Sequence, residues 1–464
     1  MKYKLKPNYH FSPEKNWMND PNGLTYYQGE YHLFFQYNPN ADVWGDIHWG
    51  HAASTDLVHW KLLPVALSPS VEAGEAHCYS GCTVIHDGVP AIFYTSIGLN
   101  DRSPEYGAQQ WMATSSDGMV TWEKYSHNPV IENRIHDKEV ITFWRDPFIW
   151  KDGNAWLAVM SGTHNHTNGC ILLYRSTDLI NWEFLNILYE TKEFKLLECP
   201  NMIKIGEDYV MIYSPVDKLH YHIGKITDDY RFETKSAGIL DGGSGRLGYY
   251  SPNTYMNAPY DRRILFGWIS DFARKDEKSI HGWSGIQSLP RVMTIQNSDL
   301  CIAPVRECEL LRKRLVEYDP NAMESRHIPL GNGNSFEIVL EAEAAADSSI
   351  RLTLLESSDK KEKTIILYDG KDRKWTIDRS GSSLYEKVDK TSVSQSVPLC
   401  KDRKIKLRLF VDCSVIELFA NDQVTLTARM YPSLTDSIHN SMELSGSVVI
   451  NRLEQWEMEE LYNH

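Results

Sequence analysis

Short apolar strands that meet at tight turns recur along the first 300 or so residues. Each unit begins with a polar or Pro-marked stretch, continues as an apolar strand, turns, and ends in a second strand rich in aromatic residues. A short Gly-containing turn between alternating strands is a signal for a β-hairpin. The pattern therefore predicts a series of hairpins, with turns at Gly29, Gly88, Gly153, Gly206 and Asp261.

The regular spacing of these hairpins indicates a propeller. A second segment, in which a Ser and a nearby Asp precede a Trp, recurs at equal intervals from Ser54, Ser115 and Ser176, with a weaker copy at Thr227. Hairpin units repeated at roughly 50–60 residues are typical of propeller blades, and five units predict five blades. The alternative is an irregular β-sandwich. A helical solenoid is excluded, because no segment keeps an apolar period of about 3.6 residues.

The pattern changes after Pro304. Residues 307–318 are helix-like, and we expect them to form a linker. Beyond Ile328, period-two alternation predicts a β-sandwich. The whole chain is thus expected to be all-β, with a five-bladed propeller at 1–305, a partly helical linker at 306–325 and a β-sandwich at 326–464. The predicted sandwich strands are 335–343, 350–355, 364–368, 374–378, 404–411, 415–419, 424–430 and 447–456.

Composition and charge narrow the class of function. The 464 residues carry a net charge of −14, so no basic excess favours nucleic acid as a partner. No apolar run suits a membrane span or a signal peptide, and we expect a cytoplasmic protein without membrane contact. The 8 cysteines form no C-x-x-C pair and predict free thiols. The histidine pairs lack companion ligands, so neither a metal nor another cofactor is expected. Homo-oligomerisation is left open.

Three acids occupy nearly the same place in the repeat. Asp20, Asp146 and Glu198 each lie a few residues before the turn of their own hairpin. The first strand of each propeller blade lines the central channel, so we expect these side chains to converge in one pocket. Blades two and five carry Ser80 and Asn253 at this phase.

Clustered carboxyl groups suit glycoside cleavage. One carboxyl protonates the leaving oxygen while another attacks or activates water. Like charges a few ångströms apart resist joint ionisation, so one acid keeps its proton near neutral pH. A single acid of this kind is more simply a turn residue that caps backbone amides; three in phase favour a site. The 14 Trp and 25 Tyr residues suit sugar binding and strand formation equally.

Six motifs make the chain similar to glycoside hydrolase family 32, the invertases and fructanases. Three contain the acids: W-M-N-D-P-N-G at 17–23, R-D-P at 145–147 and E-C-P at 198–200. The others are W-G-H-A-x-S-x-D-L-V-H-W at 49–60, S-L-P-R at 288–291 and D-C-S-V-I-E-L-F at 412–419. The resemblance spans nearly the whole chain. It implies a five-bladed propeller joined to a β-sandwich and a retaining mechanism on β-D-fructofuranosides, without a cofactor.

The resemblance also implies roles for individual residues. Asp20 corresponds to the nucleophile, Glu198 to the acid/base, and Asp146 to the residue that holds sugar hydroxyls and stabilises the transition state. From the sequence alone, Arg145 is expected to keep the adjacent Asp146 ionised. Glu198 has no neighbouring cation, which leaves room for a raised pKa. The positions that correspond to the fructose pocket are Asn19, Gln36, Trp44, Tyr79, Ser80, Arg145 and Trp268.

Two departures from the family pattern concern specificity and the domain interface. Tyr79 stands where Phe is common and adds a hydroxyl to the sugar site. Asp412 precedes Cys413 where Arg is common, at the expected interface between the domains. The segment 243–248 matches G-x-G-x-x-G, but no helix follows, so it predicts a loop and not a dinucleotide site.

The substrate expected is a small sugar: sucrose, sucrose 6-phosphate or a short fructo-oligosaccharide. A levan- or inulin-acting exo-hydrolase, a fructosyltransferase and a catalytically silent sugar-binding propeller are the alternatives. The sequence leaves open the choice among these substrates, β-2,1 against β-2,6 linkage, and the ratio of hydrolysis to transfer. Candidates to meet a substrate phosphate are Arg102, Arg246, Lys218 and His77.

Overall fold

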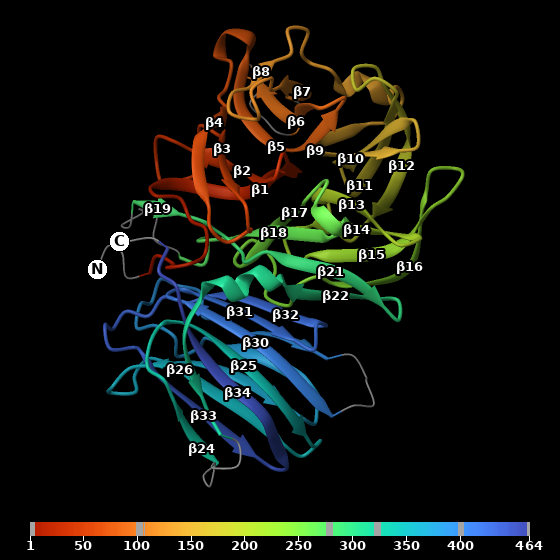
Figure 1. The fold of residues 1–464 in the computed structure, drawn as a ribbon. Helices are drawn as coiled ribbons and strands as arrows, with labels where there is room; N and C mark the ends of the chain where they lie inside the picture. Colours follow the sequence, from red (N-terminus) through yellow and green to blue (C-terminus); the bar gives the residue numbers. More distant parts are fainter. Residues whose placement is uncertain are drawn as a thin grey trace.

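The computed structural model describes residues 5–98, 105, 107–274, 282–319, 326–397 and 403–461. They form a β-propeller followed by a β-sandwich, which confirms the predicted fold class (Figure 1). No helix in this part of the chain has the length and apolar character needed to cross a bilayer. The short 3-10 helices are η1 (Val71–Ala73), η2 (Asn133–His136), η3 (Pro259–Asp261) and η4 (Arg306–Leu311).

The described propeller residues form five sheets, and each predicted hairpin supplies the first two strands of one sheet. The predicted turn glycines adopt left-handed backbone, with φ of 96° at Gly29 and 79° at Gly88. Such values are costly for residues with a side chain. The hairpins are β1 (Asn16–Tyr27) with β2 (Glu30–Asn38), β5 (Glu75–His86) with β6 (Val89–Gly98), β9 (Ile141–Asp152) with β10 (Ala155–His164), β13 (Glu198–Ile205) with β14 (Asp208–Ser214), and β17 (Tyr249–Thr254) with β18 (Arg263–Ile269).

The outer strands complete the sheets. The recurring Ser-Asp segments lie between the third and fourth strands, where the Ser54 hydroxyl donates to Asp56 at 3.1 Å and the Ser176 hydroxyl to Asp178 at 3.1 Å. These segments are therefore structural turns. The remaining strands are β3 (His48–Ser54), β4 (Lys61–Leu67), β7 (Ala108–Thr114), β8 (Glu123–Lys124), β11 (Asn168–Ser176), β12 (Trp182–Thr191), β15 (His220–Ile226), β16 (Phe232–Ile239), β19 (Trp283–Ser284), β20 (Ile286–Gln287), β21 (Arg291–Gln296) and β22 (Asp299–Pro304).

The sandwich consists of two six-stranded sheets. All eight predicted sandwich strands are present within about two residues of their predicted ends. The first sheet, in spatial order, contains β23 (Arg312–Glu317), β34 (Val448–Met458), β25 (Ser335–Ala344), β30 (Lys404–Asp412), β31 (Val415–Ala420) and β32 (Val424–Arg429). The second contains β24 (His327–Leu330), β33 (His439–Ser445), β26 (Ser349–Glu356), β27 (Thr364–Asp369), β28 (Lys374–Asp378) and β29 (Val393–Ser396).

The helix-like segment 307–318 is helical only in part. η4 covers its first turns, but the rest of the segment forms β23, an edge strand paired with β34. The partner strand supplies ladder hydrogen bonds that the local sequence does not reveal, so tertiary pairing overrides helix propensity. Residues 320–325 of the expected linker lie outside the described residues.

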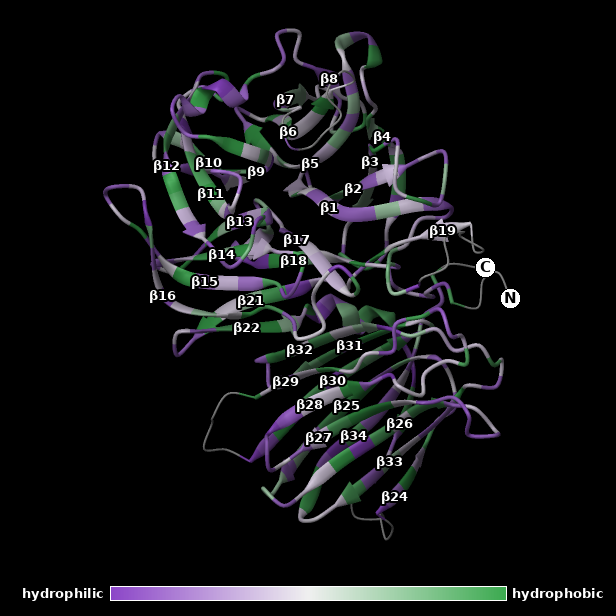
Figure 2. Ribbon diagram, turned by 180° about the vertical axis from the view of Figure 1, so that it is seen from behind, coloured by the Kyte–Doolittle hydropathy of each residue, from purple (hydrophilic) through white to green (hydrophobic). Residues whose placement is uncertain are grey.

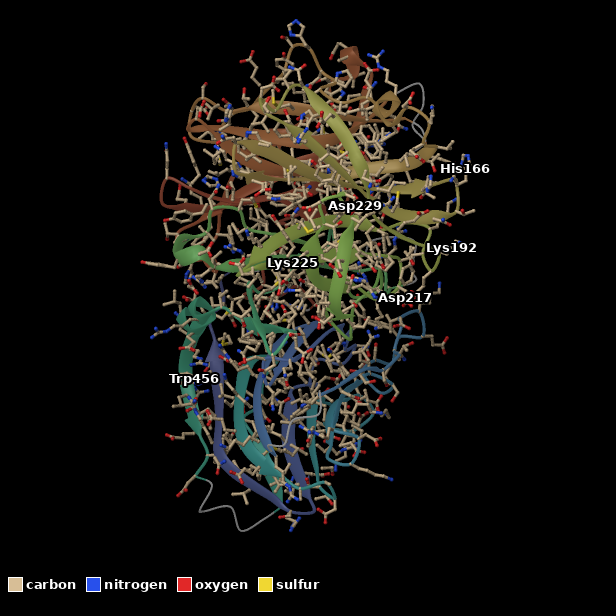
Figure 3. The ribbon with its side chains drawn as sticks, turned by 90° about the vertical axis from the view of Figure 1, so that its right-hand side faces the viewer. His166, Lys192, Asp217, Lys225, Asp229 and Trp456 are labelled. Carbon is tan, nitrogen blue, oxygen red and sulfur yellow. The ribbon has the colours of Figure 1, made fainter. Side chains whose placement is uncertain are left out.

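One apolar core fills the sandwich, and the largest core of the propeller extends to Phe410, Val415, Phe419 and Met458 of the sandwich. The sandwich core is lined by both sheets, with Trp375 and Leu352 fully buried. Green and purple positions are interspersed along the sandwich strands in Figure 2, as expected where one strand face is buried. Polar and charged residues of the propeller surface, including His166, Lys192 and Asp217, are exposed (Figure 3).

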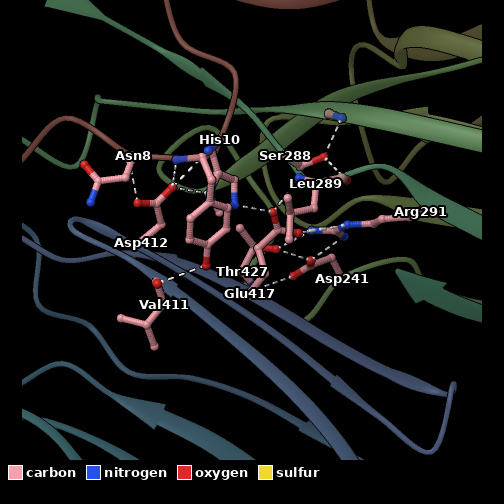
Figure 4. A network of polar contacts seen from close by, with 12 residues as sticks. Asn8, His10, Asp241, Ser288, Leu289, Arg291, Val411, Asp412, Glu417 and Thr427 are labelled. Carbon is pink, nitrogen blue, oxygen red and sulfur yellow. Dashed lines mark hydrogen bonds and ion pairs between the residues drawn. The ribbon is translucent and has the colours of Figure 1, made fainter. Parts of the chain in front are cut away.

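A buried polar network joins the amino-terminal segment, the propeller and the sandwich (Figure 4). Asp412 accepts hydrogen bonds from the backbone and ring of His10, and the other ring nitrogen of His10 lies 2.9 Å from Glu417. Glu417 also binds Arg291 at 2.6 Å, and Arg291 reaches Asp241 at 2.9 Å. All these side chains are fully buried. Asp412 thus lies in the domain interface where the sequence placed it.

Candidate active site

A β-bulge interrupts the first strand of every propeller sheet near its polar or Pro-marked motif. In each case two residues of the first strand stand opposite one residue of the second. A bulge bends the strand and redirects side chains. Proline suits such a position because it cannot donate to the ladder. The bulged pairs are Asn19 and Asp20, Tyr79 and Ser80, Asp146 and Pro147, Cys199 and Pro200, and Ser251 and Pro252.

Three of the bulges contain left-handed backbone directly before proline. The φ angles are 62° at Asp146, 49° at Cys199 and 44° at Ser251. Such conformations cost on the order of 1–3 kcal/mol each and persist only where the surrounding structure holds them. The strain lies where the chain directs polar side chains toward the centre of the propeller, which marks this end of the channel as a candidate site.

All ten predicted site residues line one cavity of about 290 Å³. The three acids therefore converge in one cavity, as their similar positions in the repeat predict, although those positions are not identical. Asp20 and Asp146 lie within their bulges, whereas Glu198 directly precedes its own. The cavity is lined by Asn19, Asp20, Gln36, Trp44, Tyr79, Ser80, Arg145, Asp146, Glu198, Cys199, Arg246, Tyr250, Ser251, Trp268 and Phe272.

Asp20 is held by polar side chains from neighbouring strands. Ser80 donates to Oδ2 at 2.9 Å, and Asn19 donates to Oδ1 at 3.2 Å. Gln36 bridges the pair, because its amide nitrogen lies 2.5 Å from Ser80 Oγ and 3.4 Å from Asp20 Oδ2. The Cys199 thiol lies 3.6 Å from the same carboxylate oxygen. These contacts fix the carboxyl group in one orientation on the cavity wall.

Glu198 is surrounded by cations and a phenol. Arg145 forms an ion pair with Oε1, and the Tyr250 hydroxyl donates to Oε2. Arg246 reaches both carboxylate oxygens at 3.2 Å. Because Tyr250 and Arg246 come from a different part of the chain, sequence neighbours gave no sign of this environment. It favours the ionised form of Glu198.

Asp146 is close enough to both other acids to interact with their charges. Its Oδ2 accepts a 2.9 Å hydrogen bond from the backbone N–H of Cys199, and Arg145 Nε lies 3.7 Å away. Its own N–H donates to Thr95 Oγ1 at 2.9 Å. The expected pairing of Arg145 with Asp146 therefore exists, but the closer partner of this arginine is Glu198. One guanidinium links two of the three acids.

The pKa order of the carboxyl groups differs from the sequence expectation. Burial, together with the charges of Asp146 and Glu198, raises the pKa of Asp20 to about 7. Burial raises the pKa of Asp146 to about 6 against the opposing charge of Arg145. Burial also opposes ionisation of Glu198, but Arg145, Arg246 and Tyr250 outweigh it and lower the pKa of Glu198. These shifts favour a proton on Asp20, and not on Glu198, near neutral pH.

Arg145 lowers the pKa of Asp146, as expected, but burial outweighs it and leaves that pKa at about 6, above the ordinary carboxyl value. Adjacency in sequence identified the cation correctly, but the expectation omitted the burial of Asp146, whose side chain is 7% exposed. Desolvation of a carboxylate disfavours its charged form. The sequence also left open a raised pKa at Glu198, but the two arginines lower it instead.

Aromatic side chains form the remaining walls of the cavity. Trp268 packs between Trp17 and Phe272, with ring centroids 5.7 Å and 5.4 Å away. Trp44 meets Tyr79 edge to face at 6.2 Å. Trp44 is 47% exposed and Phe272 is 42% exposed, so both lie at the mouth. Ring faces of this kind pack against the C–H surface of a sugar.

The sequence analysis missed several residues of the cavity. Tyr250, Ser251 and Phe272 line it but are not predicted from the sequence. Tyr250 and Ser251 precede Pro252, as Glu198 and Cys199 precede Pro200, so the recurring Pro was the available signal. For Phe272 no such signal exists, because its position depends on packing against Trp17 and Trp268.

Comparison with known proteins extends this picture to the whole chain. The model for the N-terminal domain of glycosyl hydrolases family 32 matches residues 10–304, and the model for the C-terminal domain of that family matches 307–457. A sucrose-6-phosphate hydrolase of Zymomonas mobilis is 30% identical, over 98% of this chain and 92% of that protein. A raffinose invertase of Escherichia coli is 31% identical, over 92% of this chain and 89% of that protein.

Solved structures agree with the sequence comparison. A Bombyx mori β-fructofuranosidase of family 32, a mutant in complex with sucrose, superposes with a TM-score of 0.83 at 29% identity, covering 100% of this chain and 96% of that one. Fructan 1-exohydrolase IIa of Cichorium intybus gives 0.85 at 27% identity, covering 99% and 98%. With both domain models matched in order, the chain belongs to glycosyl hydrolase family 32.

Proposed function

We propose that the protein is a retaining β-fructofuranosidase that releases terminal β-D-fructofuranosyl units from sucrose, sucrose 6-phosphate or short fructo-oligosaccharides. The observation that carries the proposal is the convergence of Asp20, Asp146 and Glu198 in one cavity of a family 32 chain. Two carboxyl groups flanking a glycosidic bond are the general requirement of this chemistry. The names of the relatives, sucrose-6-phosphate hydrolase and raffinose invertase, support the same substrate class.

In the first step the Asp20 carboxylate attacks C2 of the fructosyl unit. The C2–O bond breaks, and its electron pair goes to the glycosidic oxygen, which takes the proton of Glu198. The fixed orientation of Asp20 supports its role as nucleophile, because Ser80 and Asn19 already hold the attacking oxygens. Because the carboxylate is already held in place, the reaction avoids the entropy cost of orienting a free nucleophile in water.

In the second step water hydrolyses the fructosyl ester. Glu198, now ionised, takes a proton from water, the oxygen of that water bonds to C2, and the bond to Asp20 breaks. The arginines that lower the pKa of Glu198 favour this base form. Asp146 is proposed to hold fructosyl hydroxyls and to stabilise the positive charge that develops at C2.

The first step requires the proton to be on Glu198, although the pKa shifts described above favour a proton on Asp20. Positive charge at C2 stabilises the Asp20 anion, and displacement of Arg246 would remove one of the two cations that keep Glu198 ionised. We therefore propose that substrate binding reverses the proton order of the two carboxyls.

The remaining predicted residues are proposed to bind the sugar. Asn19, Gln36 and Ser80 present amide and hydroxyl groups beside Asp20. Arg145 and the aromatic walls described above complete the fructosyl pocket. Tyr79 places a partly buried phenol on one wall, where desolvation raises its pKa to about 12, so it offers a neutral hydroxyl.

Fructose release from sucrose and sucrose 6-phosphate, measured for wild type, Asp20→Ala and Glu198→Ala, tests this function. Both variants are expected to lose several orders of magnitude in kcat with unchanged thermal unfolding. A variant that keeps more than about a tenth of wild-type turnover, roughly 1.4 kcal/mol on the barrier, would contradict the role proposed for that residue. Ser12→Ala is a control, because the Ser12 hydroxyl is buried and has no hydrogen-bond partner in the described structure.

A further inference from the structure

Arg246 is the exposed cation of the cavity. Its side chain is 45% exposed, whereas that of Arg145 is 9% exposed. Arg145 is also enclosed between two acids, Glu198 and Asp146. Among the described residues that line the cavity, these two arginines are the cations. A group that enters from solvent therefore meets the guanidinium of Arg246 first.

The loop that carries Arg246 has a fixed backbone. Lys218 Nζ donates to the carbonyl oxygens of Gly242 at 2.5 Å and Ser244 at 3.3 Å. The N–H of Arg246 donates to the carbonyl of Val216 at 3.3 Å. The Gly-rich segment is thus a pinned loop, and only the long side chain of Arg246 extends to the cavity. Lys218 is engaged in holding this loop.

Arg246 uses only part of its hydrogen-bonding capacity on Glu198. Both bonds to the carboxylate come from Nη2, at 3.2 Å, so the Nη1 and Nε positions are not engaged by that acid. The guanidinium carbon lies 5.9 Å from the centre of the Tyr250 ring. A guanidinium is planar, always charged and able to bind phosphate oxygens in pairs. Its half-exposed position leaves it accessible to such a group.

The cavity separates a buried end from an exposed mouth. Asn19 and Ser80, which hold Asp20, are 6% and 3% exposed. Arg246, Trp44 and Phe272 are the exposed residues at the mouth. The fructosyl unit must lie against Asp20 for attack at C2. The sugar that leaves must therefore lie toward the mouth, beside Glu198 and Arg246.

We propose that Arg246 selects substrates whose leaving sugar carries a phosphate ester. The phosphate binds the guanidinium through charge-assisted hydrogen bonds and draws it away from Glu198. This inference rests on the proposed function, since it requires Glu198 to protonate the leaving sugar. It identifies the phosphorylated glucose unit of sucrose 6-phosphate as the recognised group.

The contact between the phosphate and Arg246 also favours protonation of Glu198. Once Arg246 has turned to the phosphate, Glu198 faces one guanidinium, that of Arg145, with the Tyr250 hydroxyl and the carboxyls of Asp20 and Asp146 nearby. Loss of one cation makes a carboxylate easier to protonate. A phosphorylated substrate therefore helps to move the proton onto the group that must donate it, whereas unphosphorylated sucrose does so less.

The other candidates from the sequence are placed differently. His77 packs against Trp44 and Tyr79, with ring centroids 5.5 Å and 5.9 Å away, and its Nδ1 accepts from the N–H of Ile47 at 3.3 Å. It therefore supports the aromatic wall. Arg102 lies outside the described residues.

Values of kcat/KM for sucrose 6-phosphate and sucrose, measured in phosphate-free buffer, test the inference. Wild type is expected to prefer the phosphorylated sugar by at least about tenfold, and Arg246→Gln is expected to lower that preference about ten- to hundredfold. Arg246→Gln should change kcat/KM for sucrose less than it changes kcat/KM for sucrose 6-phosphate. Arg175→Gln is the matched control, since Arg175 is also half exposed, at 44%, and pairs with a glutamate, Glu183.

The possible results distinguish a failure of the proposed role of Arg246 from a failure of the proposed function. No fructose from either sugar would refute the function itself. Equal rates on both sugars, or a preference that survives in Arg246→Gln, would overturn the inference while the function stands. A large, equal loss on both sugars in Arg246→Gln would also overturn it, because Arg246 would then serve catalysis in general. Inhibition by glucose 6-phosphate should weaken in Arg246→Gln, whereas inhibition by fructose should not.

Discussion

Replacement of Ser80 by Ala should expose how the site holds its proton. The Ser80 hydroxyl donates to Asp20 Oδ2 at 2.9 Å and stabilises the ionised carboxylate. A hydrogen bond to a charged group contributes about 1.5–3 kcal/mol. Its loss therefore raises the pKa of Asp20, which is about 7 in the wild type, by roughly one to two units.

The expected effect on the rate has two parts. Catalysis needs one proton in the pair formed by Asp20 and Glu198, and the free enzyme loses that proton above about pH 7. Ser80→Ala keeps the proton to higher pH, so the alkaline limb of kcat/KM should move upward. The proton is also held more firmly on Asp20, where it blocks attack, so the plateau of kcat/KM should fall roughly ten- to hundredfold.

The assay is the pH dependence of kcat/KM for sucrose, which reports ionisations of the free enzyme. Ser12→Ala is the control for removal of a buried hydroxyl. A fall in rate with an unmoved alkaline limb would mean that Ser80 acts only by packing. A limb that moves to lower pH would refute the reasoning about Asp20.

Three further predictions concern stability. Arg291→Met should lower the free energy of unfolding by about 3–5 kcal/mol, because it leaves Glu417 buried without its arginine; a urea titration showing a loss below 1 kcal/mol would count against this. Burial opposes protonation of His10, but its acidic partners raise its pKa to about 9. This stabilisation is complete below about pH 6.5 and lost as pH rises through about 9, so the difference in Tm between wild type and His10→Gln should shrink over that range; parallel curves would contradict it. A Cβ at Gly81 would lie 2.0 Å from a backbone oxygen, whereas a Cβ at Gly88 would have no heavy atom within 4 Å. Gly81→Ala should therefore reduce both Tm and kcat/KM far more than Gly88→Ala. Similar losses for the two variants in calorimetry and in the activity assay would contradict this.

The fold was largely predictable because its signals are local. Alternation of apolar residues and glycine turns is written into short segments, so hairpins such as that at Gly29 were located correctly. Segment 307–318 failed because its second half is stabilised by pairing with β34, more than 130 residues away in sequence. The bulges were also not predictable as such, since the pattern shows a Pro but not which side chain it redirects.

The sequence identified many of the residues that line the cavity, but it did not predict their electrostatic environment. Phase in the repeat brought Asp20, Asp146 and Glu198 together, because each blade repeats the same strand geometry. The charge environment depends on contacts between blades, such as those of Arg145 and Arg246 with Glu198. Sequence neighbours therefore left open a raised pKa at Glu198, whereas in the folded chain the pKa of Asp20 is raised and that of Glu198 is lowered.

The proposed mechanism requires Asp20 to form a covalent bond to the fructosyl unit. The most direct measurement is intact-protein and peptide mass spectrometry of Glu198→Ala incubated with β-D-fructofuranosyl fluoride, whose leaving group needs no acid. The second step is slow without Glu198, so we expect a mass increase of one fructosyl unit on the peptide that contains Asp20. Turnover of the fluoride without an adduct, or an adduct on a different residue, would contradict it.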